Sequence, residues 1–222
     1  TAYEIASCLV GSEMCIRDRA HGEAPTQLMM LLHGWGADGN DLADLARPYS
    51  IRFPCMAFFV PNGPDPCKMN PAGREWFDID DRVNGPIMAA QFIDNALADA
   101  LNILNLSASA LALAGFSQGG MMSLHCGLRQ TPAPAAIISF SGTLLLHEDL
   151  VETDPNAPYS PVLLIHGTED EVVPFQFQAA SRDILKARSI EVETVDCVGL
   201  GHGIDPDGLS AAIKFLAKYL PT

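Results

Sequence analysis

Short apolar runs that alternate with longer helical patterns constrain the fold of this chain more than any other feature. The runs are residues 27–33, 55–62, 110–116, 135–142, 161–167 and 190–197. All but the last are almost continuously apolar, as strands must be when helices cover both faces of their sheet. Strands that alternate with helices form β-α-β units. The sequence therefore predicts an α/β fold with a mostly parallel, doubly wound sheet and helices on both faces.

Helical patterns fill the intervals between these runs and follow the last one. They are residues 40–49, 87–104, 118–130, 175–189 and 207–220. In the longest pattern, apolar residues recur at helical spacing and predict a buried stripe of Ile87, Met88, Phe92, Ile93, Leu97, Leu101 and Leu104. Pro-rich loops at 61–73 and 153–161 separate elements, and no repeat or linker interrupts the chain. Residues 20–222 are therefore expected to form one domain.

The first 19 residues differ in character from the rest. Leu9 to Arg19 has no amphipathic period and joins abruptly to the following segment. The first ten residues of this stretch can be encoded by a transposase adapter used in sequencing libraries. We therefore expect residues 1–19 to be a translated assembly artefact that lies outside the domain. A genuine short extension is the alternative.

The charge of the chain argues against several classes of partner. The 222 residues carry a formal net charge of −14, which disfavours binding to nucleic acid or to an anionic membrane surface. No apolar run reaches the roughly 18 residues needed to span a bilayer. We expect a small-molecule substrate as the partner of a protein that is a monomer or a homodimer.

Cysteine usage indicates a reducing compartment. Beyond residue 19 the cysteines are Cys55, Cys67, Cys126 and Cys197, and they form neither a CxxC pair nor the spacing of zinc ligands. Scattered cysteines in a domain of this size are typical of reduced, mostly buried thiols, so we expect a cytoplasmic protein. A disulfide between Cys55 or Cys67 and a distant cysteine is the alternative.

A serine surrounded by glycines follows the run at 110–116. The segment Gly115-Phe116-Ser117-Gln118-Gly119 fits the pattern G-x-S-x-G, with a strand pattern before it and a helical pattern after it. In a nucleophile elbow the serine occupies a strained strand-to-helix turn, which needs small flanking residues. The helix N-terminus then favours negative charge that develops near the hydroxyl. The alternative is a glycine-rich helix start with an ordinary N-cap serine.

Acyl transfer to a serine also needs two backbone N–H donors for the oxyanion. The residue after the serine supplies one of them, and a loop after an early strand supplies the other. Gln118 and Trp35 occupy these positions, and glycines on both sides of Trp35 let the loop turn inward. His33 has no second metal ligand at usable spacing, so we expect it to brace the loop.

Two later strand ends carry an acid and a histidine. Asp170 follows the run at 161–167, and His202 lies between two glycines after the run at 190–197. An aspartate in such a site orients the base histidine and stabilises its imidazolium. The order Ser117, Asp170, His202 is the one found in α/β-hydrolases. A solvated acidic loop and an ordinary loop histidine are the alternatives.

The remaining histidines lack this context. They are His21, His125, His147 and His166. His125 lies within the helix expected after the serine, and we expect it to pack in the interior.

Five segments together resemble the carboxylesterase/phospholipase family, which includes the acyl-protein thioesterases. They are LLHGWGADGNDL, MNPAGREWFDI, GFSQGG, HGTEDEVVP and GHG. The resemblance runs from Gln27 to the C-terminus. It implies that Ser117 is the nucleophile, Asp170 the orienting acid and His202 the base, with Trp35 and Gln118 as oxyanion donors.

The same resemblance implies contacts with the substrate. It places Met69 and Trp76 near the acyl group, and we also expect Phe116 and Val172 to contact it. The segment 69–76 departs from the family in being rich in Pro and Gly and in carrying Arg74 and Glu75. Whether the loop at 62–79 closes over the substrate is left open by the sequence.

The sequence thus predicts a serine hydrolase that cleaves carboxylic esters through an acyl-enzyme, with short to medium acyl chains. The mechanism requires no metal and no organic cofactor. A thioesterase or lysophospholipase that acts on long acyl chains is the first alternative. A non-catalytic binding module with a hydrolase fold is an alternative from another class.

Overall fold

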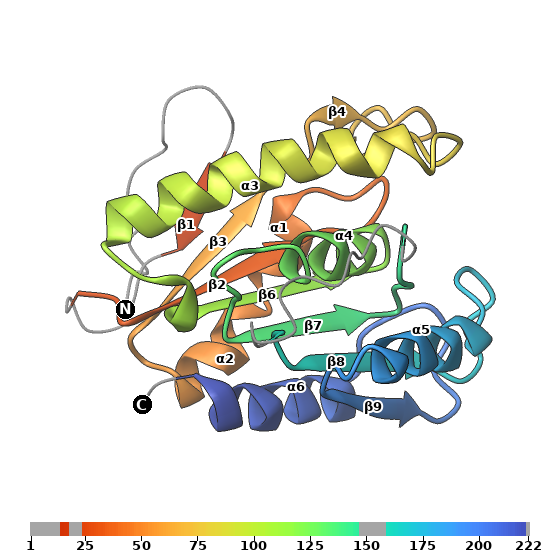
Figure 1. Ribbon diagram of the computed structural model, residues 1–222. Coiled ribbons are helices and arrows are strands. Elements are labelled where there is room, and N and C mark those ends of the chain that lie inside the picture. The colour runs from red at the N-terminus through yellow and green to blue at the C-terminus, as the bar shows by residue number, and fades with distance from the viewer. Residues whose placement is uncertain (1–13, 18–23, 147–158, 221–222) are drawn as a thin grey trace.

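A seven-stranded sheet forms the centre of the protein (Figure 1). The computed structural model describes residues 14–17, 24–146 and 159–220. The strands are β1 Met14–Arg17, β2 Gln27–Leu32, β3 Met56–Pro61, β6 Leu111–Phe116, β7 Ala136–Phe140, β8 Val162–Gly167 and β9 Val192–Cys197. Their order across the sheet is β1-β3-β2-β6-β7-β8-β9. In this sheet, each strand other than β1 coincides with one of the predicted apolar runs.

All neighbouring strands are parallel except at one edge. Met29 of β2 lies opposite Phe58 of β3 and Ala112 of β6. At the edge, β1 pairs antiparallel with β3, with Cys15 opposite Val60. Four residues of the segment 1–19 therefore form a strand that the sequence pattern did not predict. The other residues of that segment lie outside the described residues, as do His21 and His147.

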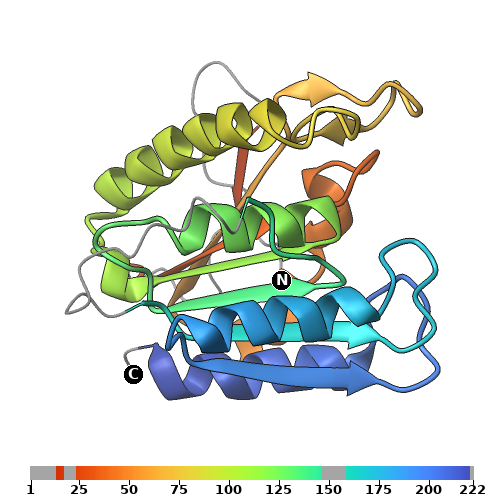
Figure 2. The same ribbon diagram turned by 45° about the vertical axis from the view of Figure 1, so that its right-hand side comes forward.

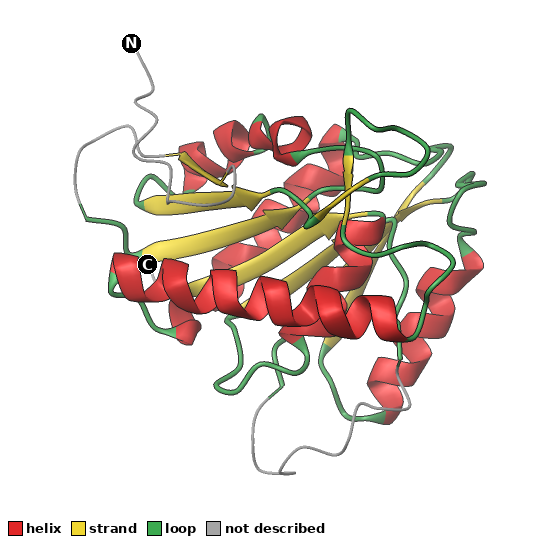
Figure 3. Ribbon diagram, turned by 90° about the horizontal axis from the view of Figure 1, so that it is seen from above, coloured by secondary structure: helices red, strands yellow, loops and turns green. Residues whose placement is uncertain are grey.

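Helices cover both faces of the sheet, as predicted (Figure 3). They are α1 Gly39–Ala43, α2 Ala46–Arg52, α3 Asn84–Leu104, α4 Gln118–Gly127, α5 Gln176–Ala187 and α6 Pro206–Tyr219. Met29 of β2 packs in a cluster with Tyr49 of α2 and Phe215 of α6. Its neighbour Met30 packs on the other face with Ile93 of α3. The alternation follows from the period of two in a strand.

The helices α3, α4 and α5 lie side by side over one face (Figure 2). Leu97 of α3 and Met122 of α4 belong to the cluster on that face, and Leu185 of α5 packs with Leu124 of α4 and Leu164 of β8. Burying this apolar surface on both faces is the main stabilising contribution, at roughly 25 cal/mol per Å² removed from water.

Two predicted helices differ in detail from the structure. The pattern at 40–49 forms two short helices, α1 and α2, because the chain turns at Asp44 and Leu45. In α3 the buried face consists of Pro86, Ala89, Ile93, Ala96, Leu97 and Ala100, whereas Ile87 and Met88 are 42% and 69% exposed. Alanines line the face where the helix approaches its neighbours, so the predicted stripe of large apolar side chains coincides only in part with the buried face.

A small hairpin and a short 3₁₀ turn lie outside the large sheet. The hairpin pairs β4 Asp65–Pro66 with β5 Arg74–Glu75, and a 3₁₀ turn at Ala108–Ala110 precedes β6. Cys55, Cys67, Cys126 and Cys197 are free, as the sequence indicated. Among the helices that the structure describes, none has the length and apolar character required to cross a bilayer.

Candidate active site

The turn from β6 into α4 places Ser117 in a backbone conformation that few non-glycine residues adopt. Ser117 has φ 54° and ψ −118° and lies at the N-cap of α4. A Cβ at Gly119 would lie 1.9 Å from the carbonyl oxygen of Leu32, and one at Gly115 would lie 2.2 Å from the carbonyl oxygen of Gly119. Gly119 is therefore required because α4 starts directly against the end of β2, and Gly115 because the first turn of α4 packs against β6.

The loop after β2 lies beside the serine. A Cβ at Gly34 would be 3.5 Å from the Cβ of Ser117. The backbone N–H groups of Trp35 and Gln118 donate no hydrogen bond to any residue that the structure describes. Gln118 is the first residue of α4, where N–H groups lack partners within the helix. Two unpaired N–H donors next to a serine can stabilise an oxyanion.

Hydrogen bonds from His33 hold this loop in place. Its Nδ1 donates to the carbonyl oxygen of Gly34 at 2.8 Å, and its Nε2 accepts from the N–H of Gly63 at 2.8 Å. His33 is fully buried, and this burial lowers its pKa. The neutral ring can both donate and accept, which matches these two bonds. His33 thus braces the loop against the segment that follows β3.

The side chain of Gln118 ties the elbow to the segment after β5. Its Oε1 accepts from the N–H of Trp76 at 2.9 Å, and its Nε2 donates to the carbonyl oxygen of Phe77 at 2.7 Å. Trp35 Nε1 donates to the buried carboxylate of Glu75 at 2.7 Å. The two segments that flank the serine are therefore linked to each other and to α4.

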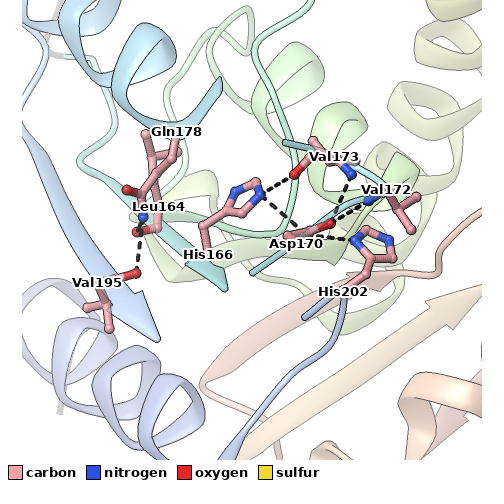
Figure 4. Close-up of polar contacts among 8 residues, drawn as sticks. All are labelled: Leu164, His166, Asp170, Val172, Val173, Gln178, Val195 and His202. Atoms are coloured by element: carbon pink, nitrogen blue, oxygen red, sulfur yellow. Dashed lines mark hydrogen bonds and ion pairs between the residues drawn. The ribbon is translucent and has the colours of Figure 1, made fainter. Parts of the chain in front are cut away.

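Asp170 and His202 meet across the ends of β8 and β9 (Figure 4). His202 Nδ1 donates to Asp170 Oδ2 at 2.8 Å, while the N–H groups of Val172 and Val173 both donate to Oδ1 at 2.9 Å. Burial acts to raise the pKa of Asp170, but the hydrogen bonds from His202, Val173 and Val172 outweigh it and lower the pKa below its usual value. The carboxylate therefore stays ionised and fixes the orientation of the His202 ring.

His202 and Ser117 face the same cavity. The ring of Phe116, next to the serine, lies 4.7 Å from the ring of His202 between centroids. Within the described ranges, no hydrogen bond joins Ser117 to His202. Such contacts are often long in a structure without substrate and shorten when the substrate binds.

The cavity has a volume of about 860 Å³ and lies at the carboxyl ends of the strands. Trp35 and Gln118, the expected oxyanion donors, and Phe116 and Val172, the expected substrate contacts, are on its wall. Most of the remaining wall is apolar, with Leu42, Leu45, Phe77, Ile79, Met121, Leu144, Leu145, Val173, Phe177, Ile184 and Ile204. Pockets of this size and character bind small organic ligands.

Neither Trp76 nor Met69, which the resemblance places near the acyl group, lies on the wall of this cavity. Trp76 is 1% exposed and packs in the core, where its Nε1 donates to the carbonyl oxygen of His33 at 2.8 Å. Met69 is 78% exposed. Its loop closes on itself through the N–H of Cys67, which donates to the carbonyl oxygen of Gly73.

His166 is a site residue that the sequence analysis missed. It lies near the end of β8, and its Nε2 is 3.3 Å from Asp170 Oδ2 and 2.7 Å from the carbonyl oxygen of Val173 (Figure 4). Its position at a strand end, four residues before Asp170, was the available signal. Among the residues that the structure describes, these included, no group of three or more His, Cys, Asp or Glu side chains is arranged to hold a metal ion.

Comparison with known sequences identifies relatives of the whole domain. Residues 19–220 match the profile of a family described as phospholipase/carboxylesterase. Acyl-protein thioesterase 1 of Gibberella zeae is 30% identical over 217 residues, which cover 88% of this chain and 92% of that protein. Esterase YpfH of Escherichia coli K12 is 29% identical over 203 residues, which cover 88% of this chain and 84% of YpfH.

Solved structures share the same architecture. Esterase PE8 is 37% identical and superposes with a TM-score of 0.84, covering 94% of this chain and 98% of PE8. A carboxylesterase from Mesorhizobium loti, at 21% identity, has the same fold with a TM-score of 0.80 over 96% of this chain and 99% of its own. With its α/β-hydrolase fold, the chain is an enzyme that belongs to the phospholipase/carboxylesterase family.

Proposed function

We propose that this enzyme hydrolyses carboxylic esters through an acyl-enzyme intermediate on Ser117. The observation that carries the proposal is the buried Asp170 carboxylate hydrogen-bonded to His202, which shares a cavity with a serine held at positive φ. Each of the three residues follows a different strand of the sheet. Relatives named esterase, carboxylesterase and acyl-protein thioesterase support the same reaction class.

The proposed reaction begins with His202 as the base. Its Nε2 accepts the proton of Ser117 while the hydroxyl oxygen attacks the ester carbonyl carbon. The oxyanion is held by the N–H groups of Trp35 and Gln118. His202 then gives the proton to the departing alkoxide, and a water molecule, deprotonated by His202, releases the acid from the serine. Asp170 keeps Nδ1 protonated and stabilises the imidazolium in both halves of the reaction.

Because the cavity wall is mostly apolar, we expect the substrate to carry an apolar acyl group. We propose short to medium acyl chains as the preferred substrates. Long acyl chains are the second candidate, favoured by the cavity volume of about 860 Å³ and by relatives named acyl-protein thioesterase. Comparison of kcat/KM for acetyl, octanoyl and palmitoyl esters separates the two, because each methylene that is bound in the transition state adds about 0.8 kcal/mol.

Mass mapping after reaction with a fluorophosphonate tests the proposal. An activated serine is phosphonylated, so a single adduct is expected on the peptide that contains Ser117. The adduct should disappear in Ser117→Ala and in His202→Ala, while both variants keep the wild-type thermal transition. Absence of an adduct on a wild-type protein that melts cooperatively would favour the non-catalytic binding module instead.

We also propose that the protein acts in the cytoplasm as a monomer or a homodimer. The free thiols of Cys67, Cys126 and Cys197, all buried, support a reducing compartment. Light scattering coupled to size-exclusion chromatography measures the oligomeric state. A tetramer or a larger assembly would contradict this part of the proposal.

A further inference from the structure

The carboxylate of Asp170 accepts three hydrogen bonds, and the ring of a buried histidine lies close to it. Oδ1 accepts from the N–H groups of Val172 and Val173, and Oδ2 accepts from Nδ1 of His202. The nearby histidine is His166, whose Nε2 lies 3.3 Å from Oδ2. An ionised carboxylate has about four lone-pair sites, so a polar ring nitrogen stands beside an oxygen whose hydrogen-bonding capacity is not filled.

The hydrogen-bond partner of His166 determines its tautomer. Nε2 lies 2.7 Å from the carbonyl oxygen of Val173, which can only accept, so Nε2 carries the proton. The side chain is 1% exposed and its ring stands edge-on to Phe175, 6.0 Å away between centroids. The proton on Nε2 is therefore held in a fixed position next to Asp170.

Solvent does not reach Asp170 to replace this contact. Its side chain is completely buried. A buried carboxylate that loses a polar group beside it loses part of the electrostatic field that favours its charge and its orientation. The plane of the Asp170 carboxylate determines the direction of the His202 ring, which in turn decides where Nε2 of that ring meets the serine.

We propose that His166 is a positioning residue for the Asp170–His202 pair. Its Nε2–H donates to the carbonyl oxygen of Val173, whose own N–H donates to Oδ1, and Nε2 lies 3.3 Å from Oδ2. These contacts hold the carboxylate in the plane that directs the His202 ring toward Ser117. The inference rests on the proposed function, since it assumes that His202 acts as the base. It goes beyond that function by giving a role to His166, a buried histidine that is not on the cavity wall.

A purely structural role of His166 must be distinguished from positioning, because its hydrogen bond to Val173 also fastens the cavity wall to β8. Val172 and Val173 line the cavity, so loosening of their loop alone would weaken substrate binding and raise KM. Misorientation of His202 would instead lower kcat. The share of the Asp170 charge available to His202 would also change, which alters the pH dependence of activity.

Three variants separate these roles. His166→Phe keeps a ring and removes the N–H. His166→Gln places an amide nitrogen four bonds from Cα, as Nε2 is in histidine, and so keeps the donor. Gln178→Met is the matched control, because Gln178 is buried and donates to the carbonyl oxygens of Leu164 and Val195 without touching Asp170 (Figure 4).

We expect kcat of His166→Phe to fall about tenfold, by a larger factor than KM rises, since the variant removes the polar group beside Asp170 together with the hydrogen bond to Val173. The acid limb of its profile of kcat/KM against pH should move to higher pH, since Asp170 then holds the proton on His202 more strongly. The other titratable side chains next to Asp170 along the chain, Glu169 and Glu171, are exposed and are unchanged in the variants. His166→Gln should recover kcat to within about threefold.

The control variant fixes the interpretation. Gln178→Met should lower the melting temperature and leave kcat and the pH profile at the wild-type values. A His166→Phe variant with wild-type kcat and an unmoved pH profile would overturn the inference, as would a change in KM alone. Full activity of Ser117→Ala would overturn the proposed function instead, so failures of the two proposals are distinguishable.

Discussion

Ser117 has a strained backbone conformation that hydrogen bonding and packing of its neighbours hold in place. Non-glycine residues at positive φ cost about 1–3 kcal/mol and persist only where the surroundings fix them. Here the N–H of Ser117 donates to the carbonyl oxygen of Phe140 at 2.8 Å, and Gly119 lets α4 start against Leu32 and His33. The strain is thus balanced by close packing of α4 on β2 and β7.

Replacement of Gly119 by alanine tests this packing. Its Cβ would lie 1.9 Å from the carbonyl oxygen of Leu32, so we expect a loss of about 3 kcal/mol or more in the free energy of unfolding. Gly201→Ala is the control, because the nearest atom to its Cβ would be 3.8 Å away and the change should stay within about 0.5 kcal/mol. Urea denaturation measures both, and equal stability of the two variants would contradict the packing described for the elbow.

The lowered pKa of Asp170 predicts how stability depends on pH. An aspartate in an unfolded chain titrates near 4, and the stabilisation from a carboxylate with a lower folded-state pKa is complete above that value. It is lost as the pH falls through the folded-state pKa. The difference in unfolding free energy between wild type and Asp170→Asn should therefore be largest above about pH 4 and shrink at lower pH. A difference that stays constant from pH 6 to pH 3 would show that the carboxylate charge contributes nothing.

At the scale of elements, the segment from Gly63 to Phe77 is fastened to the elbow. Arg74 exchanges backbone hydrogen bonds with the loop after β2: its carbonyl oxygen accepts from the N–H of Gly36, and its N–H donates to the carbonyl oxygen of Ala37. Trp76 and Phe77 are bonded to the side chain of Gln118. These tethers fix the segment beside the elbow and, with it, Phe77, which is part of the cavity wall.

Removal of the Gln118 amide tests whether this wall depends on it. In Gln118→Met the N–H of Trp76 and the carbonyl oxygen of Phe77 lose their buried partners, which costs about 1–3 kcal/mol for each group. KM should rise as well, because Phe77 and Ile79 line the cavity. Gln130→Met serves as the control, since Gln130 bonds to Asp94 at the surface. If both variants unfold at the same urea concentration as wild type, the tether is not what holds the segment.

At the scale of the whole molecule, the site depends on β2, β6, β8 and β9 and not on the edge strand β1. The residues of the site follow the carboxyl ends of those strands, whereas β1 pairs only with β3. The family match also begins at residue 19. We propose that residues 1–19 are not part of the native domain.

Deletion of residues 1–19 is therefore expected to keep a cooperative thermal transition and at least half of the wild-type kcat/KM. The uncovered edge of β3 should increase self-association, because unpaired strand edges bind one another. Calorimetry, ester hydrolysis and light scattering measure these three properties. A truncated protein without a cooperative transition would show that β1 is required for the fold.

Local sequence determined most of the framework of this protein. The period and apolarity of the runs from 27–33 to 190–197 predicted the strands from β2 to β9 that form the large sheet, because a strand buried on both faces must be apolar throughout. The glycines around Ser117 predicted a tight turn, because close backbone approach excludes a Cβ. The positions of Asp170 and His202 after strand patterns, and their order after Ser117, also predicted them as a pair. His202 Nδ1 lies 2.8 Å from Asp170 Oδ2.

Only the tertiary structure decided where Trp76, Met69 and His166 lie. Trp76 lies in the core and Met69 in solvent because hydrogen bonds to His33 and within the 67–73 loop fix their directions. His166 lies against Asp170 because the chain folds back from Val173 onto the end of β8. Periodicity reports which face of an element is buried, and it carries no information about these contacts, since they depend on how separate segments pack together in three dimensions.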